Sequence, residues 1–165
     1  MPADRQHNAY PIGYHIARMG TAELDATAID DVLTERGTGT LSLATDDDAY
    51  AVPQSFGYDG DALYFQLIYD EDSEKMARIE ATDVASFTAY SEAPPRSVLA
   101  RGPIEAVSGD GESAATAAIA ENAWLPTVNV IPERGFDELD SAYYRLRPRK
   151  LTGRSFGVGF DAPTA

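Results

Sequence analysis

The sequence contains no cysteine, and it has only two histidines and two lysines among its 165 residues. The lack of cysteine excludes disulfides, thiolate metal sites and thiol catalysis. The two histidines, His7 and His15, lie eight residues apart, which fits neither a helical metal site nor a positioned general base. We therefore expect exposed histidines near the N-terminus and no metal centre.

Long apolar segments are also missing. No run of eighteen apolar residues exists, and the first fifteen residues lack a charged region followed by an apolar stretch and a small-residue cleavage site. These absences predict a cytoplasmic protein that has no membrane partner.

Positive charge is scarce. Against 27 acidic residues stand 13 basic ones, which gives a formal net charge of −14. Such a chain repels phosphate backbones, so nucleic acid is not an expected partner. The acids are spread along the chain rather than gathered in a tail, which is typical of a halophilic protein kept soluble at high salt. The alternative is an ordinary acidic protein.

The length predicts one domain over residues 1–165, with 44% hydrophobic residues available for a core. Residues 1–20 show no sustained period and are expected to form an arm that orders only by docking. A helix is predicted over 27–36, where Thr27 and Asp30 have the spacing of a capping box and Gly37 follows as a stop.

Strand patterns follow the helix. Segments rich in β-branched or aromatic residues, separated by turn signals, predict strands at 38–44, 50–58, 62–69, 83–91, 96–108 and 141–152. The first three read as an antiparallel meander within a barrel core at 38–108. Pro53 cannot donate to a sheet ladder, which predicts an edge, a bulge or a ligand-facing position for the second strand.

Helical patterns interrupt these strands. Ser73 is a good N-cap for residues 74–81, residues 111–123 are rich in alanine, and a short helix is expected near 133–139. Strands at hairpin spacing with too few helices for regular alternation favour a small barrel. The predicted class is mainly β, a six-stranded antiparallel barrel with about three packed helices.

Two places concentrate positive charge. Residues 141–154 contain five cations and no acid, and in a strand Arg145, Arg147 and Arg149 share one face. These arginines either pair with acidic neighbours or bind an anion. Lys75 follows four acidic residues and lies next to the Ser73 cap, in the first helical turn, where the dipole favours acids. It is either a surface lysine paired with Glu71 or Glu74, or part of a site for an anion such as phosphate.

No nucleophile elbow, P-loop or dinucleotide-binding turn is present. The segments YAVPQSFGYDGDALYFQ, SEKMARI and ATDVASFTAYSEAPPRSVLARGPIEAV, in that order and spacing, resemble the pyridoxamine 5′-phosphate oxidase-like, FMN-binding split-barrel proteins. The resemblance covers roughly residues 27–108 and is nearest to small members that include nitroimidazole-resistance-like proteins. It implies a homodimer with FMN in two grooves at the interface.

The resemblance also implies positions for the cofactor contacts. Lys75 and Ser73 would hold the FMN phosphate, and Gln66 and Leu67 would flank the ribityl chain. The strand along the isoalloxazine ring would comprise Tyr50, Ala51, Val52, Pro53, Gln54 and Ser55. Further contacts would come from Arg96 and Ser97, and from the second subunit through Trp124 and the arginines of 145–149, with Arg147 among them.

The functional hypothesis is an FMN-dependent oxidoreductase that passes hydride or electrons between a reduced donor and a small-molecule acceptor. The chain lacks the C-terminal histidine with which the oxidase itself binds substrate phosphate, which argues against pyridoxamine phosphate as the substrate. One alternative is a non-catalytic flavin-binding or flavin-storage dimer. Another is a split barrel that binds deazaflavin F420 or heme.

Overall fold

The computed structural model describes residues 19–122 and 134–159. Its strands are β1 (Met19–Glu23), β2 (Thr38–Thr45), β3 (Asp48–Ser55), β4 (Gly57–Tyr58), β5 (Leu63–Tyr69), β6 (Val84–Glu92), β7 (Pro95–Val107), β8 (Asp140–Leu146) and β9 (Lys150–Gly159). Its helices are α1 (Ala26–Glu35), α2 (Glu74–Glu80), α3 (Asp110–Asn122) and the short 3-10 helix η2 (Phe136–Glu138). His7, His15 and Trp124 lie outside the described residues.

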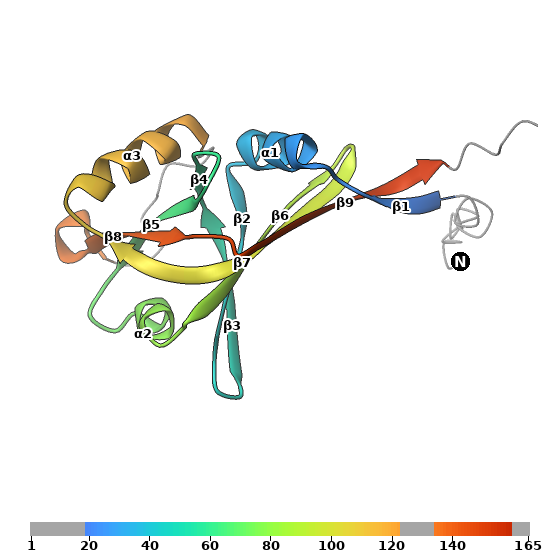
Figure 1. Ribbon diagram of the computed structural model, residues 1–165. Coiled ribbons are helices and arrows are strands. Elements are labelled where there is room, and N and C mark those ends of the chain that lie inside the picture. The colour runs from blue at the N-terminus through green and yellow to red at the C-terminus, as the bar shows by residue number, and fades with distance from the viewer. Residues whose placement is uncertain (1–18, 123–133, 160–165) are drawn as a thin grey trace, which may run out of the picture.

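The antiparallel strands follow the order β3-β2-β6-β7-β8-β5-β4, and β9 joins β7 to β1. The long strand β7 shapes this sheet, as Figure 1 shows by its curved path. Its first half lies between β6 and β9, and its second half pairs with β8. One strand therefore belongs to both parts of a curled half-barrel, and the predicted mainly β split barrel with three α-helices is confirmed.

The strand count differs from the prediction, because the sheet has nine strands rather than six. The expected strand at 50–58 divides into β3 and β4 at Phe56, which is fully buried and whose N–H donates to Gly37 O at 3.1 Å. The expected strand at 141–152 divides into β8 and β9, so Arg149 lies beyond the end of β8. The last two residues of the expected arm, Met19 and Gly20, belong to β1, which pairs with β9.

The predicted three-stranded meander is confirmed only in part: β2 pairs with β3 and β4 pairs with β5, both antiparallel, but β3 does not pair with β5. β2 lies between β3 and β6, whereas β4 and β5 lie at the other end of the sheet path. β3 is therefore an end strand, which confirms the edge position expected from Pro53.

The N-cap of helix α1 lies two residues earlier than the capping box suggested. Asp25 is its N-cap and accepts a hydrogen bond from Ala28 N at 2.9 Å. Asp30, predicted as part of that box, accepts instead from the hydroxyl of Tyr58 in β4 at 2.7 Å. Helix α2 begins as predicted, with Ser73 accepting from Met76 N.

The core lies between the sheet and the helices. Phe56, Phe65 and Phe87 are fully buried, and the ring centroids of Phe56 and Phe87 are 4.7 Å apart. Asn122 at the end of α3 is also buried, and its amide donates to Arg36 O at 2.6 Å and to Phe56 O at 3.4 Å. This side chain ties α3 to the end of α1 and to the junction between β3 and β4.

Inward and outward residues alternate along β3, β2, β6, β7 and β9. We call the outward set the outer face; it consists of Thr38, Thr40, Ser42, Ala44, Ala49, Ala51, Pro53, Ser55, Val84, Ser86, Thr88, Tyr90, Glu92, Pro95, Ser97, Leu99, Arg101, Lys150, Thr152 and Arg154. Glu92 is the one acidic residue of this set. In the part of the chain that the structure describes, no helix is long and apolar enough to cross a membrane.

Candidate functional site

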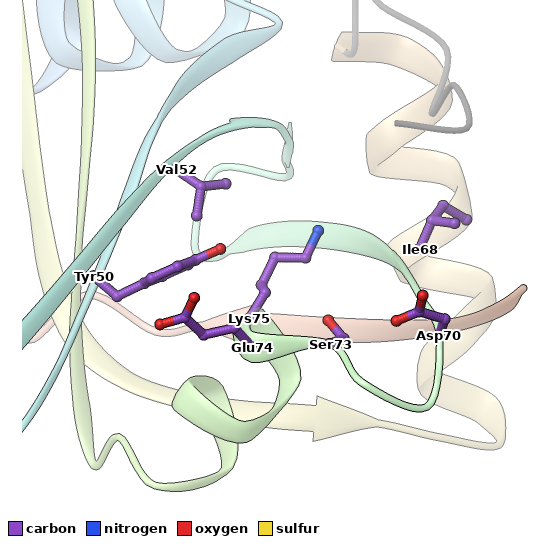
Figure 2. A pocket seen from close by; sticks show the side chains of 7 residues that line it. All are labelled: Tyr50, Val52, Ile68, Asp70, Ser73, Glu74 and Lys75. Carbon is purple, nitrogen blue, oxygen red and sulfur yellow. The ribbon is translucent and has the colours of Figure 1, made fainter. Parts of the chain in front are cut away.

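A cavity of about 280 Å³ lies between the end strand β3, the end of β5 and the start of α2. We call it the Lys75 cavity; it is lined by Tyr50, Val52, Ile68, Asp70, Ser73, Glu74 and Lys75. Figure 2 shows Lys75 extending from the start of α2 into the space between Tyr50 and Ile68. An aromatic wall, two aliphatic walls and one ammonium group therefore converge on one space.

The ammonium of Lys75 has no acidic partner. Among residues 19–122 and 134–159, no carboxylate oxygen lies within 4.0 Å of its nitrogen, although four acidic residues precede it in the sequence. The side chain is half-buried, and this burial lowers the pKa of Lys75. The surface ion pair considered from the sequence is thus not formed.

The nearby carboxylates are held by arginines. Arg78 bridges Glu74, at 3.3 Å, and Asp48 at the start of β3. Asp70 lies 3.9 Å from Arg134. Asp70 and Glu74, the two acids that line the cavity, are thus engaged by arginines, and the Lys75 charge faces the cavity.

Strand β3 supplies the cavity with alternate residues, because successive side chains point to opposite faces. Tyr50 and Val52 line the Lys75 cavity, whereas Pro53 lines a second cavity of about 510 Å³ on the outer face. Gln54 shares the face of Tyr50, and its amide donates at 3.2 Å to Gln66 O in β5. This contact joins two strands that are not paired in the sheet.

Part of the predicted set of cofactor contacts lies together in the structure, while the contacts themselves remain predictions. Four predicted residues, Tyr50, Val52, Ser73 and Lys75, line one cavity, and Gln54 and Gln66 contact each other close by. Ala51 is exposed on the outer face, and the Leu67 side chain is fully buried in the core, so neither side chain faces the Lys75 cavity.

Other predicted contacts lie elsewhere in the chain. Arg96 pairs with Glu35 at 3.1 Å, and Arg147 lies 3.5 Å from Glu105 and 3.6 Å from Asp61. Ser97 is on the outer face, opposite Tyr90 in β6. None of these three lines the Lys75 cavity of its own chain.

Sequence reasoning missed three lining residues, Ile68, Asp70 and Glu74. A signal existed for Ile68, because it stands two residues after Gln66 and so shares its face of β5. No pattern marked Asp70, which lies 3.9 Å from the distant Arg134, whereas Glu74 and Arg78 have the i,i+4 spacing of a helical ion pair.

Arg145 in β8 and Arg147 just after its end favour pairing with acidic neighbours over an anion site. Arg145 donates to Glu105 at 2.6 Å, and this ion pair lowers the pKa of Glu105. Tyr144 and Leu146 are buried on the opposite face of β8. Arg145 and Arg147 thus pair with acids of their own chain.

A family model described as pyridoxamine 5′-phosphate oxidase matches residues 25–155. No curated protein matches the chain. Solved structures do resemble it. One is a candidate 5-nitroimidazole antibiotic resistance protein from Bacteroides thetaiotaomicron, with 16% identity and a TM-score of 0.64 over 84% of this chain and 89% of that one.

Two structures from Mycobacterium smegmatis are also similar. An FAD-binding protein has 21% identity and a TM-score of 0.62, over 84% of this chain and 100% of that one. A heme-binding protein has 17% identity and a TM-score of 0.59, over 86% of this chain and 57% of that one. Because the sequence identities are this low, the structural similarity establishes a shared fold.

Proposed function

The chain belongs to the pyridoxamine 5′-phosphate oxidase family, and we propose that it is a flavin oxidoreductase that holds FMN in the Lys75 cavity. The observation that carries this proposal is the unpaired, half-buried ammonium of Lys75. Burying a cation without a partner costs free energy, and a terminal phosphate would supply the missing negative charge. The FAD-binding protein among the similar structures supports a flavin as the ligand class.

The other lining residues fit a flavin. Tyr50, Val52 and Ile68 provide the apolar and aromatic surface that a fused ring needs. Ser73 would add a hydroxyl near the phosphate. The end strand β3 pairs on one side with β2, which leaves its other main-chain edge available to the polar rim of the ring.

When bound, the isoalloxazine ring supplies the redox chemistry by taking up and passing on a hydride or electrons. The residues of the chain would position the ring, exclude water and set the charge around it. In this proposal the ring carries out the redox step and the protein holds the ring in place. In the described part of the chain, no group of histidine, cysteine or carboxylate side chains could hold a metal ion. The donor is a reduced small molecule and the acceptor a second one.

We propose a homodimer that completes this site. The Lys75 cavity, at about 280 Å³, lies just under the range of about 300 to 1,000 Å³ typical of small-molecule pockets. Arg96, Ser97 and Arg147 do not reach it within one chain. Cofactor contacts by these residues, and by Trp124, remain predictions that require a second subunit.

A second candidate is a heme-binding split barrel, which the heme-binding protein among the similar structures favours. The described residues contain no histidine, so an axial ligand of that kind would have to be His7 or His15. A non-catalytic flavin-binding dimer would use the same cavity as the proposed enzyme.

Absorption spectroscopy of the purified protein tests these alternatives. The proposal expects a flavin spectrum, extracted FMN by mass spectrometry, and bleaching by NADH or NADPH without oxygen. A flavin that no reduced nicotinamide bleaches would favour the binding dimer. A Soret band would favour heme, and a colourless protein that does not bind added FMN would contradict the proposal.

A further inference from the structure

The second cavity, on the outer face, has a volume of about 510 Å³, within the range of about 300 to 1,000 Å³ typical of small-molecule sites. We call it the Arg36 cavity; its lining includes Arg36, Thr38, Thr40, Pro53, Tyr90 and Glu92. It shares no lining residue with the Lys75 cavity. Val52 lines the Lys75 cavity and the next residue, Pro53, lines the Arg36 cavity, so the two spaces lie on opposite faces of β3.

Arg36 carries a positive charge that nothing in the described chain neutralises. The structure describes four half-buried arginines, and three of them, Arg78, Arg96 and Arg145, form ion pairs with carboxylates. No carboxylate oxygen of the described residues lies within 4.0 Å of the Arg36 guanidinium. Its Nε is buried and has no hydrogen-bond acceptor there either. Burial removes water from this guanidinium without replacing it, so an anion gains more here than at a fully hydrated arginine.

The main chain of Arg36 is held from two sides. Its N–H donates to Val32 O at 3.1 Å, at the end of α1, and its carbonyl oxygen accepts from the amide of Asn122 at 2.6 Å. The side chain therefore starts from a fixed position beside the cavity, and a ligand has little order to impose on it. Because both bonds use main-chain atoms of Arg36, replacing its side chain leaves them in place.

The strands under the cavity provide hydroxyl donors and an apolar surface. Thr40 in β2 is the cross-strand neighbour of Pro53 in β3. The hydroxyls of Thr38 and Thr40 make no hydrogen bond to any described residue, so both can donate to a ligand oxygen. Tyr90 in β6 is 58% exposed, and with Pro53 it offers an aromatic and aliphatic surface to the body of a ligand.

Glu92 adds a negative charge to the wall of the same cavity. It is exposed at the end of β6, and its carboxylate oxygens lie more than 4.0 Å from the nitrogens of Arg36. The two charges therefore do not form an ion pair with each other. A ligand with one negative group can approach Arg36, whereas a second negative group would be repelled by Glu92. The cavity thus suits a monoanion better than a dianion such as a phosphate monoester.

We propose that the Arg36 cavity binds a small molecule that has one carboxylate and an aromatic or apolar body. The planar guanidinium fork of Arg36 matches the two oxygens of a carboxylate. The two threonine hydroxyls would donate to the same group, the ring of Tyr90 would contact the body, and Glu92 would select against a second negative charge. This inference concerns binding alone and does not depend on the flavin proposed for the Lys75 cavity.

Fluorine NMR of para-fluorobenzoate at millimolar concentration tests this site in the purified full chain without added FMN. Para-fluorobenzyl alcohol has the same ring and no charge, and fluorophthalate carries a second carboxylate. Arg36→Gln is the test variant. Arg101→Gln is its control, because Arg101 is an exposed arginine of the outer face that also has no ion pair in the described chain. Salt at about 0.15 M limits the repulsion of anions by the net charge of −14, and circular dichroism verifies that each variant is folded.

The wild type is expected to bind para-fluorobenzoate more tightly than the alcohol. Arg36→Gln should weaken the binding of para-fluorobenzoate about tenfold and that of the alcohol hardly at all, while Arg101→Gln should change neither. No binding of para-fluorobenzoate by the wild type, or equal losses in the two arginine variants, would overturn the inference.

Glu92→Gln tests the selection against a second charge. It should strengthen the binding of fluorophthalate several-fold and change that of para-fluorobenzoate less, because the dicarboxylate brings the additional repelled group. An unchanged affinity for fluorophthalate would overturn this role of Glu92.

Lys75→Ala separates the Arg36 cavity from the candidate flavin site, because the ammonium of Lys75 can also attract a carboxylate. Binding of para-fluorobenzoate should be unchanged in Lys75→Ala and should persist when the wild type is saturated with FMN. A loss in Lys75→Ala as large as that in Arg36→Gln would overturn the inference. A protein that binds FMN but not para-fluorobenzoate would overturn the Arg36 site and leave the flavin site standing, and the reverse result would support the Arg36 site and contradict the flavin site.

Discussion

The amide of Gln54 in β3 donates a hydrogen bond to the main-chain oxygen of Gln66 in β5, at 3.2 Å. The two strands are not paired, so this bond is a direct link across the side of the half-barrel that holds the Lys75 cavity. Replacing Gln54 by alanine should lower the free energy of unfolding by about 0.5 to 1.5 kcal/mol, the net value of a typical hydrogen bond.

Urea unfolding measures this change, and Gln54→Glu provides the matched comparison. A carboxylate cannot donate to the Gln66 oxygen, so the glutamate variant should be at least as destabilised as the alanine variant. Equal stability of Gln54→Glu and the wild type would show that the link contributes nothing.

The N-terminus of α1 permits a test between the predicted and the observed cap. Asp25→Ala should destabilise the protein by about 0.5 to 2 kcal/mol, because the N–H of Ala28 loses its acceptor. Thr27→Ala, at the position that the sequence pattern favoured, should change stability by less than about 0.5 kcal/mol. Thermal unfolding of the two variants distinguishes the caps, and the reverse order of stabilities would restore the original capping box.

Asn122 should be among the more sensitive polar residues of the fold. Its amide serves two main-chain oxygens, those of Arg36 and Phe56. Asn122→Ala would leave these buried acceptors without a donor, at a cost of about 1 to 3 kcal/mol. Thr116→Ala in the same helix removes only an exposed hydroxyl that bonds to Glu112 O, and it is the control. Similar denaturation midpoints for the two variants would contradict this account.

The sequence predicted the elements that local patterns control. Alternation and turn residues located most strands, and Ser73 was correctly assigned as the cap of α2. Pairing between strands was harder, because nothing local shows that β2 lies between β3 and β6. The same limit applies to Asp25, which local spacing could not distinguish from Thr27.

For the candidate site, too, local patterns were informative and long-range contacts could not be predicted. The resemblance identified Lys75, and strand alternation would have favoured Ile68 over the buried Leu67. The charge balance around Lys75 was beyond prediction, because it depends on Arg78 meeting Asp48 of another element. Long-range ion pairs of this kind follow from the tertiary arrangement.

Lys75 should also make stability depend on pH. Burial lowers the pKa of Lys75, so between this lowered value and the ordinary value of about 10.4 the unfolded chain binds the proton more tightly. Its contribution to stability therefore rises with pH across that window. Lys75→Met removes the contribution, so its advantage over the wild type should shrink as the pH approaches 10.4.

Paired urea unfolding of the wild type and Lys75→Met at neutral and alkaline pH measures this difference, and the titration of all other groups cancels in the comparison. A constant difference between the two proteins across the window would show that the Lys75 ammonium is not desolvated.

The most direct test of the account compares FMN with riboflavin, which lacks the phosphate, in the wild type and in Lys75→Ala. If Lys75 holds the phosphate, the substitution should weaken FMN binding by about 1.5 to 3 kcal/mol, roughly 10- to 150-fold, and leave riboflavin binding nearly unchanged. Equal losses for both ligands, or no loss for FMN, would contradict the assignment of Lys75 as the phosphate-binding residue.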